Sequence, residues 1–366
     1  MKLTEKEQAR REYLREQKPR VFEKVSRFEE KYWRGESIAL IQLQYNYRCN
    51  MLCEHCSIES YQKNAAGKRS LTPEDVKKLA DEADALGLAR FVISGGEPTI
   101  FPDLDELVAA IGPERFFVNC DSNGFLLAEK AEHLKTIGID RIQLSIDSLT
   151  PEEHDSFRRK PGAWKRAMEG VEACQRIGLL LYIQTVVTKQ RLHSDEFEQF
   201  VRFFNEKGLG VFISFAKPVG AYAGHYESMI DANDLAYERE LEKKYHLFTH
   251  LTPGYGLEMG CVGVKGFVSV TQYGDVQPCP YFHCSIGNIF DTPLRDILSR
   301  GMEIKYFGEH YDECFLAQNV QWVQKYIEKP IYGKPVPVSY TEVFNSEDKT
   351  QNKYWISERQ PEDKEP

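Results

Sequence analysis

The feature that most constrains the fold is a regular alternation of short β-rich runs and amphipathic helical stretches, which begins at Ile38. A strand that is followed by a helix and then by another strand usually pairs with it in parallel. Repetition of this unit therefore predicts a parallel sheet, flat or rolled into a barrel. The predicted strands are 38–46, 89–94, 115–121, 141–147, 180–187 and 210–216.

Two of the intervening helices have clear start signals. Thr72-Pro73-Glu74-Asp75 and Thr150-Pro151-Glu152-Glu153 each combine a capping hydroxyl, a proline and acidic residues of the first turn. They predict helices over about 73–86 and 151–157.

The rest of the chain predicts further units around this sheet. The first residues are dense in Glu, Lys and Arg and predict a helical arm that breaks near Pro19. Runs at 266–271 and 276–277, joined through Tyr273-Gly274-Asp275, predict a hairpin. The predicted organisation is a charged helical arm (1–37), a partial barrel (38–225), a connecting helical segment (226–258), a small α+β unit (259–328) and an extended tail (329–366).

Charge and hydropathy exclude several classes of partner. The net charge of -9 provides no broad basic field for nucleic acid. The start of the chain lacks the apolar core of a secretion signal, and no stretch approaches the roughly 18 apolar residues that would cross a bilayer. We therefore expect a cytoplasmic protein. Its nine cysteines are then poor candidates for disulfides, and seven of them fall in two groups with ligand-like spacing.

The first group, Cys49, Cys53 and Cys56, lies directly after the first predicted strand, in CNMLCEHC. Three thiolates on one short loop hold three corners of an iron–sulfur cube and leave one iron open. A zinc site usually takes four ligands in two pairs, and the chain has a single C-x2-C pair. The spacing therefore favours an iron–sulfur cluster over zinc.

The C-x3-C-x2-C spacing resembles the signature of the radical S-adenosylmethionine (SAM) superfamily, and the resemblance covers residues 38 to about 217. Gly95-Gly96-Glu97-Pro98, at the end of the second predicted strand, is similar to the family motif for the methionine end of SAM. Glycines let the backbone approach a ligand, and the Glu97 carboxylate would accept a hydrogen bond from the amino group. The resemblance implies a 4Fe-4S cluster that cleaves SAM reductively to a 5'-deoxyadenosyl radical, which abstracts hydrogen from a substrate.

Other segments extend the resemblance. Ser145 and Asp147 share a strand face with Gln143 and are similar to family residues that reach the ribose of SAM, although Asp147 as a cap of the next helix stays an alternative. His55 stands where the family has an aromatic residue beside the adenine, or is an exposed loop residue. Arg158, or its neighbour Arg159, resembles an arginine that meets the SAM carboxylate, or ends a solvated helix. The implied SAM-binding residues are His55, Gly95, Gly96, Glu97, Pro98, Ser145, Asp147 and Arg158.

The second group comprises Cys261, Cys279, Cys284 and Cys314 and resembles the twitch or SPASM extension of this family, which holds an auxiliary 4Fe-4S cluster. Cys284 departs from the family pattern because it precedes the short helix after the Gly-Asn pair instead of following it. Four thiolates, or three with an open iron, both stay open, as do His283 or His310 as substitute ligands and a zinc knuckle.

Catalytic candidates are placed at the ends of the predicted strands, where barrel enzymes carry their sites. They are Cys120, Asp121, Lys217 and Tyr222. Cys120 would donate hydrogen to a product radical or fill the core, and Cys174 is expected in the core. The loop AKPVGAYAGHYE suits hydroxyl recognition or is a plain surface loop.

The substrate is predicted to be a small polar metabolite of the sugar, aminoglycoside or nucleoside type, in an oxidoreductase or other radical-based biosynthetic enzyme. Modification of a peptide or protein is the second choice, because the N-terminal arm is too short for a peptide-binding domain. The resemblance implies an electron donor such as flavodoxin or ferredoxin. A non-catalytic iron–sulfur protein for electron transfer or redox sensing is the alternative of another class, and the motif at 95–97 speaks against it.

Overall fold

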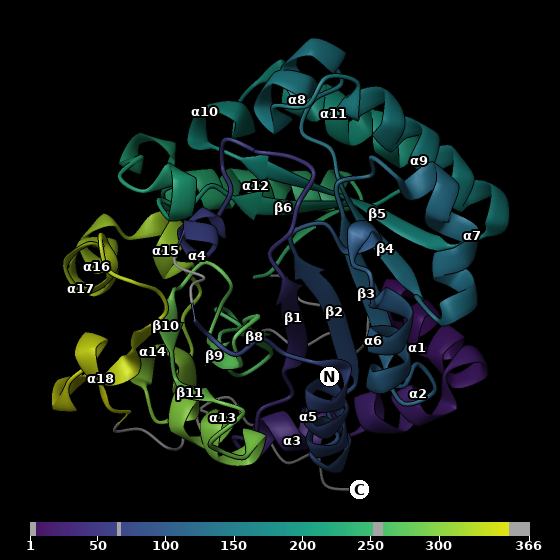
Figure 1. The fold of residues 1–366 in the computed structure, drawn as a ribbon. Coiled ribbons are helices and arrows are strands. Elements are labelled where there is room, and N and C mark those ends of the chain that lie inside the picture. The colour runs from purple at the N-terminus through teal and green to yellow at the C-terminus, as the bar shows by residue number, and fades with distance from the viewer. Residues whose placement is uncertain (1–4, 64–66, 252–258, 351–366) are drawn as a thin grey trace, which may run out of the picture.

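The computed structural model describes residues 5–63, 67–251 and 259–350. Its central feature is a ten-stranded sheet with the order β11-β9-β8-β1-β2-β3-β4-β5-β6-β7 (Figure 1). The strands that follow the predicted alternation are β1 (Leu40–Asn46), β2 (Arg90–Gly95), β3 (Phe117–Ser122), β4 (Arg141–Ser145), β5 (Leu180–Val187) and β6 (Val211–Phe215). Each pairs in parallel with the next, which confirms the predicted α/β partial barrel.

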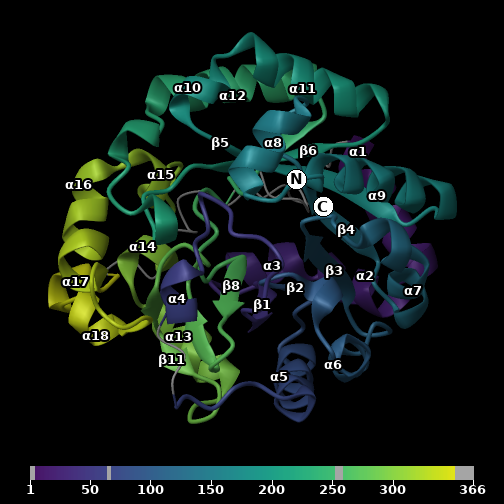
Figure 2. The same ribbon diagram turned by 45° about the horizontal axis from the view of Figure 1, so that its top comes forward.

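Helices cover the outer face of the curved sheet, as both ribbon views show (Figure 2). They are α5 (Pro73–Ala85), α6 (Leu104–Ile111), α7 (Leu127–Ile137), α8 (Pro151–Arg158), α9 (Ala163–Ile177), α10 (Lys189–Leu192), α11 (Asp195–Glu206) and α12 (Ala232–Lys244). The start of α5 is fixed as its sequence predicts, because the Thr72 hydroxyl accepts the Asp75 N–H and the Asp75 carboxylate accepts the Thr72 N–H.

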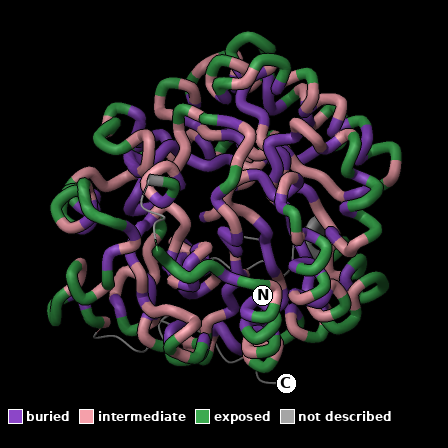
Figure 3. The backbone as a smooth tube through the Cα atoms, in the orientation of Figure 1, coloured by how far each residue is buried: buried purple, intermediate pink, exposed green. Residues whose placement is uncertain are grey.

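The two faces of the sheet differ in chemistry. Outward residues of neighbouring strands, such as Ile41, Ile93 and Val118, are fully buried against the helices and form the core. Along β4 and the second half of β5, buried residues alternate with intermediate ones, and the tube coloured by burial shows both kinds in the sheet (Figure 3). The inward positions are mostly polar: Gln42 of β1 donates a hydrogen bond to Asp121 of β3 across the interior, at 3.3 Å. The interior is thus a polar lumen.

Strands from outside the alternation extend both edges of the sheet. The predicted hairpin is confirmed as β8 (Phe267–Val270) and β9 (Asp275–Gln277), which pair antiparallel. β8 also pairs in parallel with β1, so the small C-terminal unit continues the barrel sheet. At the other edge, β7 (Leu247–Thr249) pairs in parallel with β6. This strand lies in the segment predicted to be helical, and its three residues are too short to show a period.

The N-terminal arm packs against the end of the barrel at which the parallel strands begin. α1 (Glu5–Gln17) and α2 (Pro19–Ser26) meet at the expected break, and α3 (Phe28–Trp33) follows. Val21, Val25 and Phe28 belong to a second apolar cluster with residues that flank the N-terminal ends of the strands. The first cysteine loop lies at the opposite end, directly after β1, whereas Cys261 precedes β8 and stands between Met259 and Val262 of this second cluster. No described helix has the length and apolar character needed to cross a membrane.

The C-terminal residues differ from the predicted extended tail. The tail, predicted over 329–366, contains α17 (Lys329–Ile331), β12 (Val338–Ser339) and α18 (Tyr340–Val343). The unit before it contains β10 (Cys284–Ser285), β11 (Gly287–Asn288), α13 (Leu294–Met302), α14 (Lys305–Gly308), α15 (Phe315–Gln318) and α16 (Val320–Val323). β12 pairs with β10, and Ile331, Val336 and Val338 are buried. These apolar positions are scattered among proline and charged residues, which hides them from a compositional argument. The remaining parts of the predicted arm, connecting segment and tail, 1–4, 252–258 and 351–366, lie outside the described residues.

A substitution at Ile331 tests this packing. Ile331→Ala should lower the free energy of unfolding by about 2 to 4 kcal/mol, because it leaves a cavity in a buried cluster. The exposed neighbour change Lys329→Ala is the control and should cost less than about 0.5 kcal/mol. Equal denaturation midpoints for the two variants would mean that this segment is not part of the folded core.

Candidate functional site

The first cysteine loop connects β1 to the short helix α4 (Glu59–Lys63) and carries Cys49, Cys53 and Cys56. All nine cysteines of the chain are free thiols. Burial raises the pKa of Cys49 to about 12 and that of Cys56 to about 11, and the neighbouring thiols of the loop add to both shifts. Arg158 donates to the Cys53 sulfur at 3.7 Å, which brings a cation beside this loop. The loop therefore fits an iron–sulfur cluster.

The spacing of the side chains also bears on zinc. Among the described residues, no group of three or more His, Cys, Asp or Glu side chains is close enough to hold one metal ion. A zinc ion gathers its sulfur ligands at about 2.3 Å from the metal, whereas a cube holds its cysteines at separate corners. The described side chains thus give no support for a single-ion zinc site.

The glycines of the second motif lie against the cysteine loop. The Gly96 N–H donates to the Asn46 carbonyl at 2.8 Å, and the Glu97 N–H donates to the Arg48 carbonyl at 2.9 Å. A Cβ atom on Gly96 would lie 1.8 Å from the Arg48 oxygen, and Gly95 has a φ of 115° with its Cβ position 2.5 Å from the Asn46 oxygen. These contacts require glycine whether or not a ligand is present.

Glu97 is buried at the point where β2 and β3 end. One carboxylate oxygen accepts from the Thr99 N–H, the Thr99 hydroxyl and the Ser122 hydroxyl at 3.2, 2.6 and 2.9 Å. The other accepts from the Asn123 N–H at 2.7 Å. Burial raises the pKa of Glu97, and these hydrogen bonds oppose the rise. In this arrangement Glu97 ties the two strand ends together, and a contact with the amino group of SAM stays a prediction.

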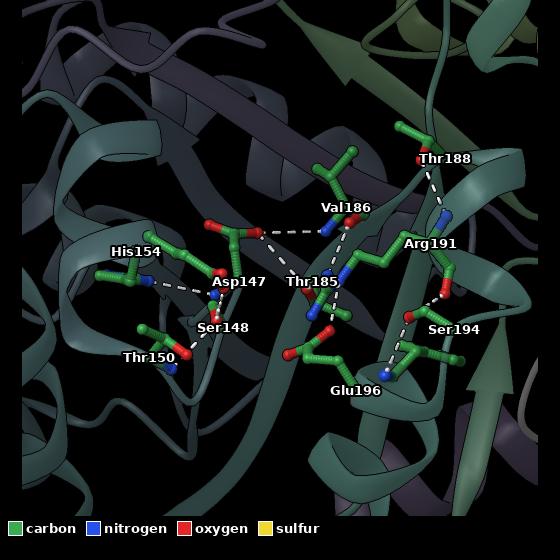
Figure 4. A network of polar contacts seen from close by, with 12 residues as sticks. Asp147, Ser148, Thr150, His154, Thr185, Val186, Thr188, Arg191, Ser194 and Glu196 are labelled. Atoms are coloured by element: carbon green, nitrogen blue, oxygen red, sulfur yellow. Dashed lines mark hydrogen bonds and ion pairs between the residues drawn. The ribbon is translucent and has the colours of Figure 1, made fainter.

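Asp147 is the centre of a second polar network, shown in Figure 4. One of its oxygens accepts from the Val186 N–H at 3.2 Å and from the Thr185 hydroxyl at 3.4 Å. The other accepts a hydrogen bond from the Arg158 Nε–H at 2.7 Å and forms an ion pair with Arg158 Nη2 at 2.6 Å. Burial alone would raise the pKa of Asp147, but the Arg158 guanidinium outweighs burial and holds the pKa well below its usual range. Asp147 does not cap α8, whose N-cap residue is Thr150.

The structure distinguishes the two arginines. Arg158 is buried between Asp147 and Cys53, whereas Arg159 is exposed. His55 is also packed, because its ring stacks on Phe157 with centroids 4.7 Å apart and planes inclined by 4°. Its Nδ1 has no hydrogen-bond partner among the described residues. The edge of Tyr222 faces the His55 ring at 6.5 Å, so the loop after β6 lies beside the first cysteine loop.

The catalytic candidates differ in the side of the sheet that they occupy. Asp121 faces the lumen, one of its oxygens has no partner in the described part of the chain, and burial raises its pKa to about 7. Lys217 is buried and donates to the Phe215 carbonyl at 2.7 Å and to the Ser214 hydroxyl at 3.3 Å. Cys120 and Cys174 are both fully buried within the apolar core. The structure thus places Cys120 on the helix-covered side, away from the lumen.

Three of the four cysteines of the second group come together. Burial raises the pKa of Cys279 to about 12 and that of Cys314 to about 11, each interacts with the charge of Cys261, and Lys217 opposes both shifts. Cys284 is buried on β10 opposite Val338 of β12, and its pKa is raised by burial and by Glu342, with no contribution from the other three cysteines among the causes found in the described residues. His310 bonds to Asp312 at 2.7 Å, and His283 or His310 as a substitute ligand stays a prediction.

Lys265 is a part of this site that the sequence did not indicate. Its ammonium group donates to the Phe307 and Glu309 carbonyls at 2.8 and 2.6 Å and interacts with Cys261. The residue is 1% exposed. Nothing in the sequence indicates that a lysine before a strand is buried in this way. Gln42 and Ser214, in contrast, could have been identified as site residues from the alternation along their strands.

Comparison with known proteins shows which families these features resemble. The model of the radical SAM superfamily matches residues 43–204, and that of an iron–sulfur cluster-binding domain matches residues 261–318. An AdoMet-dependent heme synthase of Methanosarcina barkeri is 30% identical over 289 residues, which cover 70% of this chain and 81% of the relative. A GTP 3',8-cyclase of Petrotoga mobilis is 30% identical over 310 residues, which cover 82% and 92%. Both relatives are enzymes, which favours an enzyme over a non-catalytic iron–sulfur protein.

Solved structures share the fold. Streptococcus suis SuiB bound to the precursor peptide SuiA has a TM-score of 0.57 at 18% identity, and the match covers 74% of this chain. The chain spans 66% of SuiB, just under two thirds of its length. Native anSMEcpe with bound AdoMet and Kp18Cys peptide has a TM-score of 0.56 at 17% identity, with 84% of this chain and 95% of that chain covered.

The hydrogen bonds of Glu97 make a specific prediction. Glu97→Gln replaces one acceptor oxygen by an NH2 group that faces donors, so the free energy of unfolding should fall by about 2 to 4 kcal/mol. Glu106→Gln, the same change at an exposed site on α6, should have little effect. Denaturant unfolding and SAM titration should be measured together. Unchanged stability with lost SAM affinity would assign the carboxylate to the ligand instead.

The position of Cys284 makes a second prediction. After anaerobic reconstitution the protein should hold about eight irons, Cys314→Ala about four, and Cys284→Ala again about eight. The measurement is iron per chain with the electron paramagnetic resonance spectrum of the reduced protein. Iron loss in Cys284→Ala equal to that in Cys314→Ala would restore Cys284 as a ligand.

Proposed function

Since the chain belongs to the radical SAM superfamily and carries an iron–sulfur cluster-binding domain after its barrel, we propose that it abstracts hydrogen from a small polar metabolite. Its cofactors are SAM and two 4Fe-4S clusters. A sugar, an aminoglycoside or a nucleoside-type molecule would suit the site. The electron donor would be a flavodoxin or a ferredoxin.

The polar lumen carries this proposal. The barrels of most enzymes of the (β/α)8 type are filled by branched apolar side chains. In this chain Gln42, Asp121, Gln143 and Ser145 point inward and keep part of their surface exposed. Such side chains bind hydroxyl, amide and ring nitrogen groups, and each donor or acceptor left without a partner lowers affinity for an apolar ligand. Asp121, with its free oxygen and a pKa of about 7, would hold or release a proton at neutral pH.

The residues for the first cofactor site follow from the cysteine loop. Cys49, Cys53 and Cys56 would hold the SAM-cleaving cluster, which when bound and reduced supplies the electron that breaks a carbon–sulfur bond of SAM. Arg158 would stabilise the Cys53 thiolate and keep Asp147 ionised. Asp147 with Ser145 would face the ribose, and His55, stacked on Phe157, would face the adenine. Gly95, Gly96 and Pro98 would form the wall beside the methionine end.

The second site would lie across the lumen from β3. Cys261, Cys279 and Cys314 would hold the auxiliary cluster, and Lys217 and Lys265 would balance its negative charge. Lys217 follows the end of β6, donates to the Ser214 hydroxyl and interacts with Cys279 and Cys314. This placement suits substrate binding or electron transfer from the product.

The relatives fit a small molecule, since heme synthases and GTP cyclases are named for non-peptide products and substrates. Modification of a peptide or protein is the second candidate, and the peptides bound in the SuiB and anSMEcpe structures favour it.

The test is release of 5'-deoxyadenosine from SAM by reduced, anaerobically reconstituted protein. A dialysable extract of small metabolites should raise the release severalfold, whereas a peptide fraction should not. Gln143→Leu should weaken this stimulation, because it removes a polar group of the lumen, and Gln321→Leu on the exposed face of α16 is the matched control. Stimulation by peptides alone would favour the second candidate, and no release of 5'-deoxyadenosine would contradict the radical reaction itself.

A further inference from the structure

A cavity of about 170 Å³ lies between the loop that follows β6 and the C-terminal segments around α17. Its apolar walls come from Val219, Ile327, Ile331 and Val336. Tyr281 and His283 also line it. None of these six residues belongs to the cysteine groups or to the implied SAM-binding set.

His283 lines the cavity and carries a polar atom that lacks a hydrogen-bond partner among the described residues. The side chain is 5% exposed, and its Nε2 has no hydrogen-bond partner in the described part of the chain. The imidazole bonds to the backbone of Ser57 through its other nitrogen. A neutral imidazole with its proton held by a backbone carbonyl presents a lone pair at the other nitrogen. Nε2 is therefore an acceptor without a donor.

The surroundings of the cavity connect it to the lumen and to the cysteine loop. The Tyr281 hydroxyl bonds to the Ser214 hydroxyl of β6 at 3.1 Å, and the Lys217 ammonium group lies 4.2 Å from the centre of the Tyr281 ring. On another side, the Ala221 N–H donates to the Cys56 carbonyl at 3.0 Å. One aromatic ring and one loop thus separate the cavity from the two cysteine sites.

We propose that this cavity binds a neutral, ring-sized group that carries one hydroxyl or N–H donor, with the donor bonded to His283 Nε2. The size supports a ring, because a cavity of about 150 Å³ with apolar walls takes up benzene. The apolar walls hold the faces of the ring, and the buried acceptor selects rings with a donor, since a ring without one leaves Nε2 unpaired. The use of this cavity as a subsite for part of the substrate rests on the proposed function. The binding of the ring itself does not depend on turnover.

The test uses p-cresol as the probe and toluene as its analogue without a donor. Both are titrated into anaerobically reconstituted protein without SAM or reductant, and binding is followed by saturation-transfer NMR. p-Cresol should bind at least about fivefold more tightly than toluene, from one buried hydrogen bond. His283→Phe should remove that difference, and His133→Phe, an exposed histidine on α7, should retain it. The tripeptide acetyl-Gly-Tyr-Gly-amide offers the same phenol from a peptide, so tighter binding of either probe identifies the source of the ring.

A second variant guards against misfolding of His283→Phe. Ala223 is exposed and lines the cavity, so Ala223→Trp should block the entrance while the protein keeps its iron content and melting temperature. Loss of p-cresol binding in that folded variant supports the site. Equal affinity for p-cresol and toluene, or p-cresol binding that survives both Ala223→Trp and His283→Phe, would overturn the proposal. Neither outcome depends on SAM cleavage, so a failure here and a failure of the proposed radical reaction are distinguishable.

Discussion

The close backbone contact between Gly95–Gly96 and Asn46–Arg48 is the constraint on which the rest of the site depends. Two N–H groups of the second motif donate to carbonyls of the first loop, at distances that leave no room for a Cβ atom. This contact continues the pairing of β1 with β2 beyond the strand ends and fixes where the loop with the three cysteines starts. Because Glu97 follows directly, the same contact places its carboxylate under Ser122 and Asn123. The ends of three strands are thereby held as one rigid edge.

Beside this edge, buried arginines connect the ends of the strands through hydrogen bonds and ion pairs. Arg158 links Asp147 to Cys53, and Arg191 anchors the end of β5 through the Thr185 hydroxyl and the Val186 carbonyl, at 2.5 and 2.9 Å (Figure 4). Buried ions are costly unless paired, and breaking such a pair leaves a charge without compensation. The network therefore holds the strand ends in one arrangement, and substitution of one of its charged members should lower the stability of the protein.

The sequence predicted the parts of this structure that follow from local patterns. The strands were visible from their length and β-rich composition, and Cys49, Cys53 and Cys56 from their spacing directly after a strand. Pairing between distant segments could not be predicted. β8 pairs with β1, and Gln42 lies beside Ser269 although the two are 227 positions apart in the sequence. The burial of Ile331 and Val338, and the separation of Cys284 from the other three cysteines, could not be predicted for the same reason. Each depends on packing between segments whose own composition is ordinary.

The second cysteine group is best understood from the two lysines beside it. Lys217 and Lys265 are almost fully buried, and their ammonium groups donate to carbonyl or hydroxyl oxygens that carry only partial charge. Burying a full charge against partial charges alone costs several kcal/mol. Cys261, Cys279 and Cys314 lie near these ammonium groups, Glu309 adds a carboxylate near Lys265, and a thiol that binds a metal is deprotonated. A cluster on these three cysteines would therefore convert two costly cations into stabilising ones, which an inert set of protonated thiols would not do.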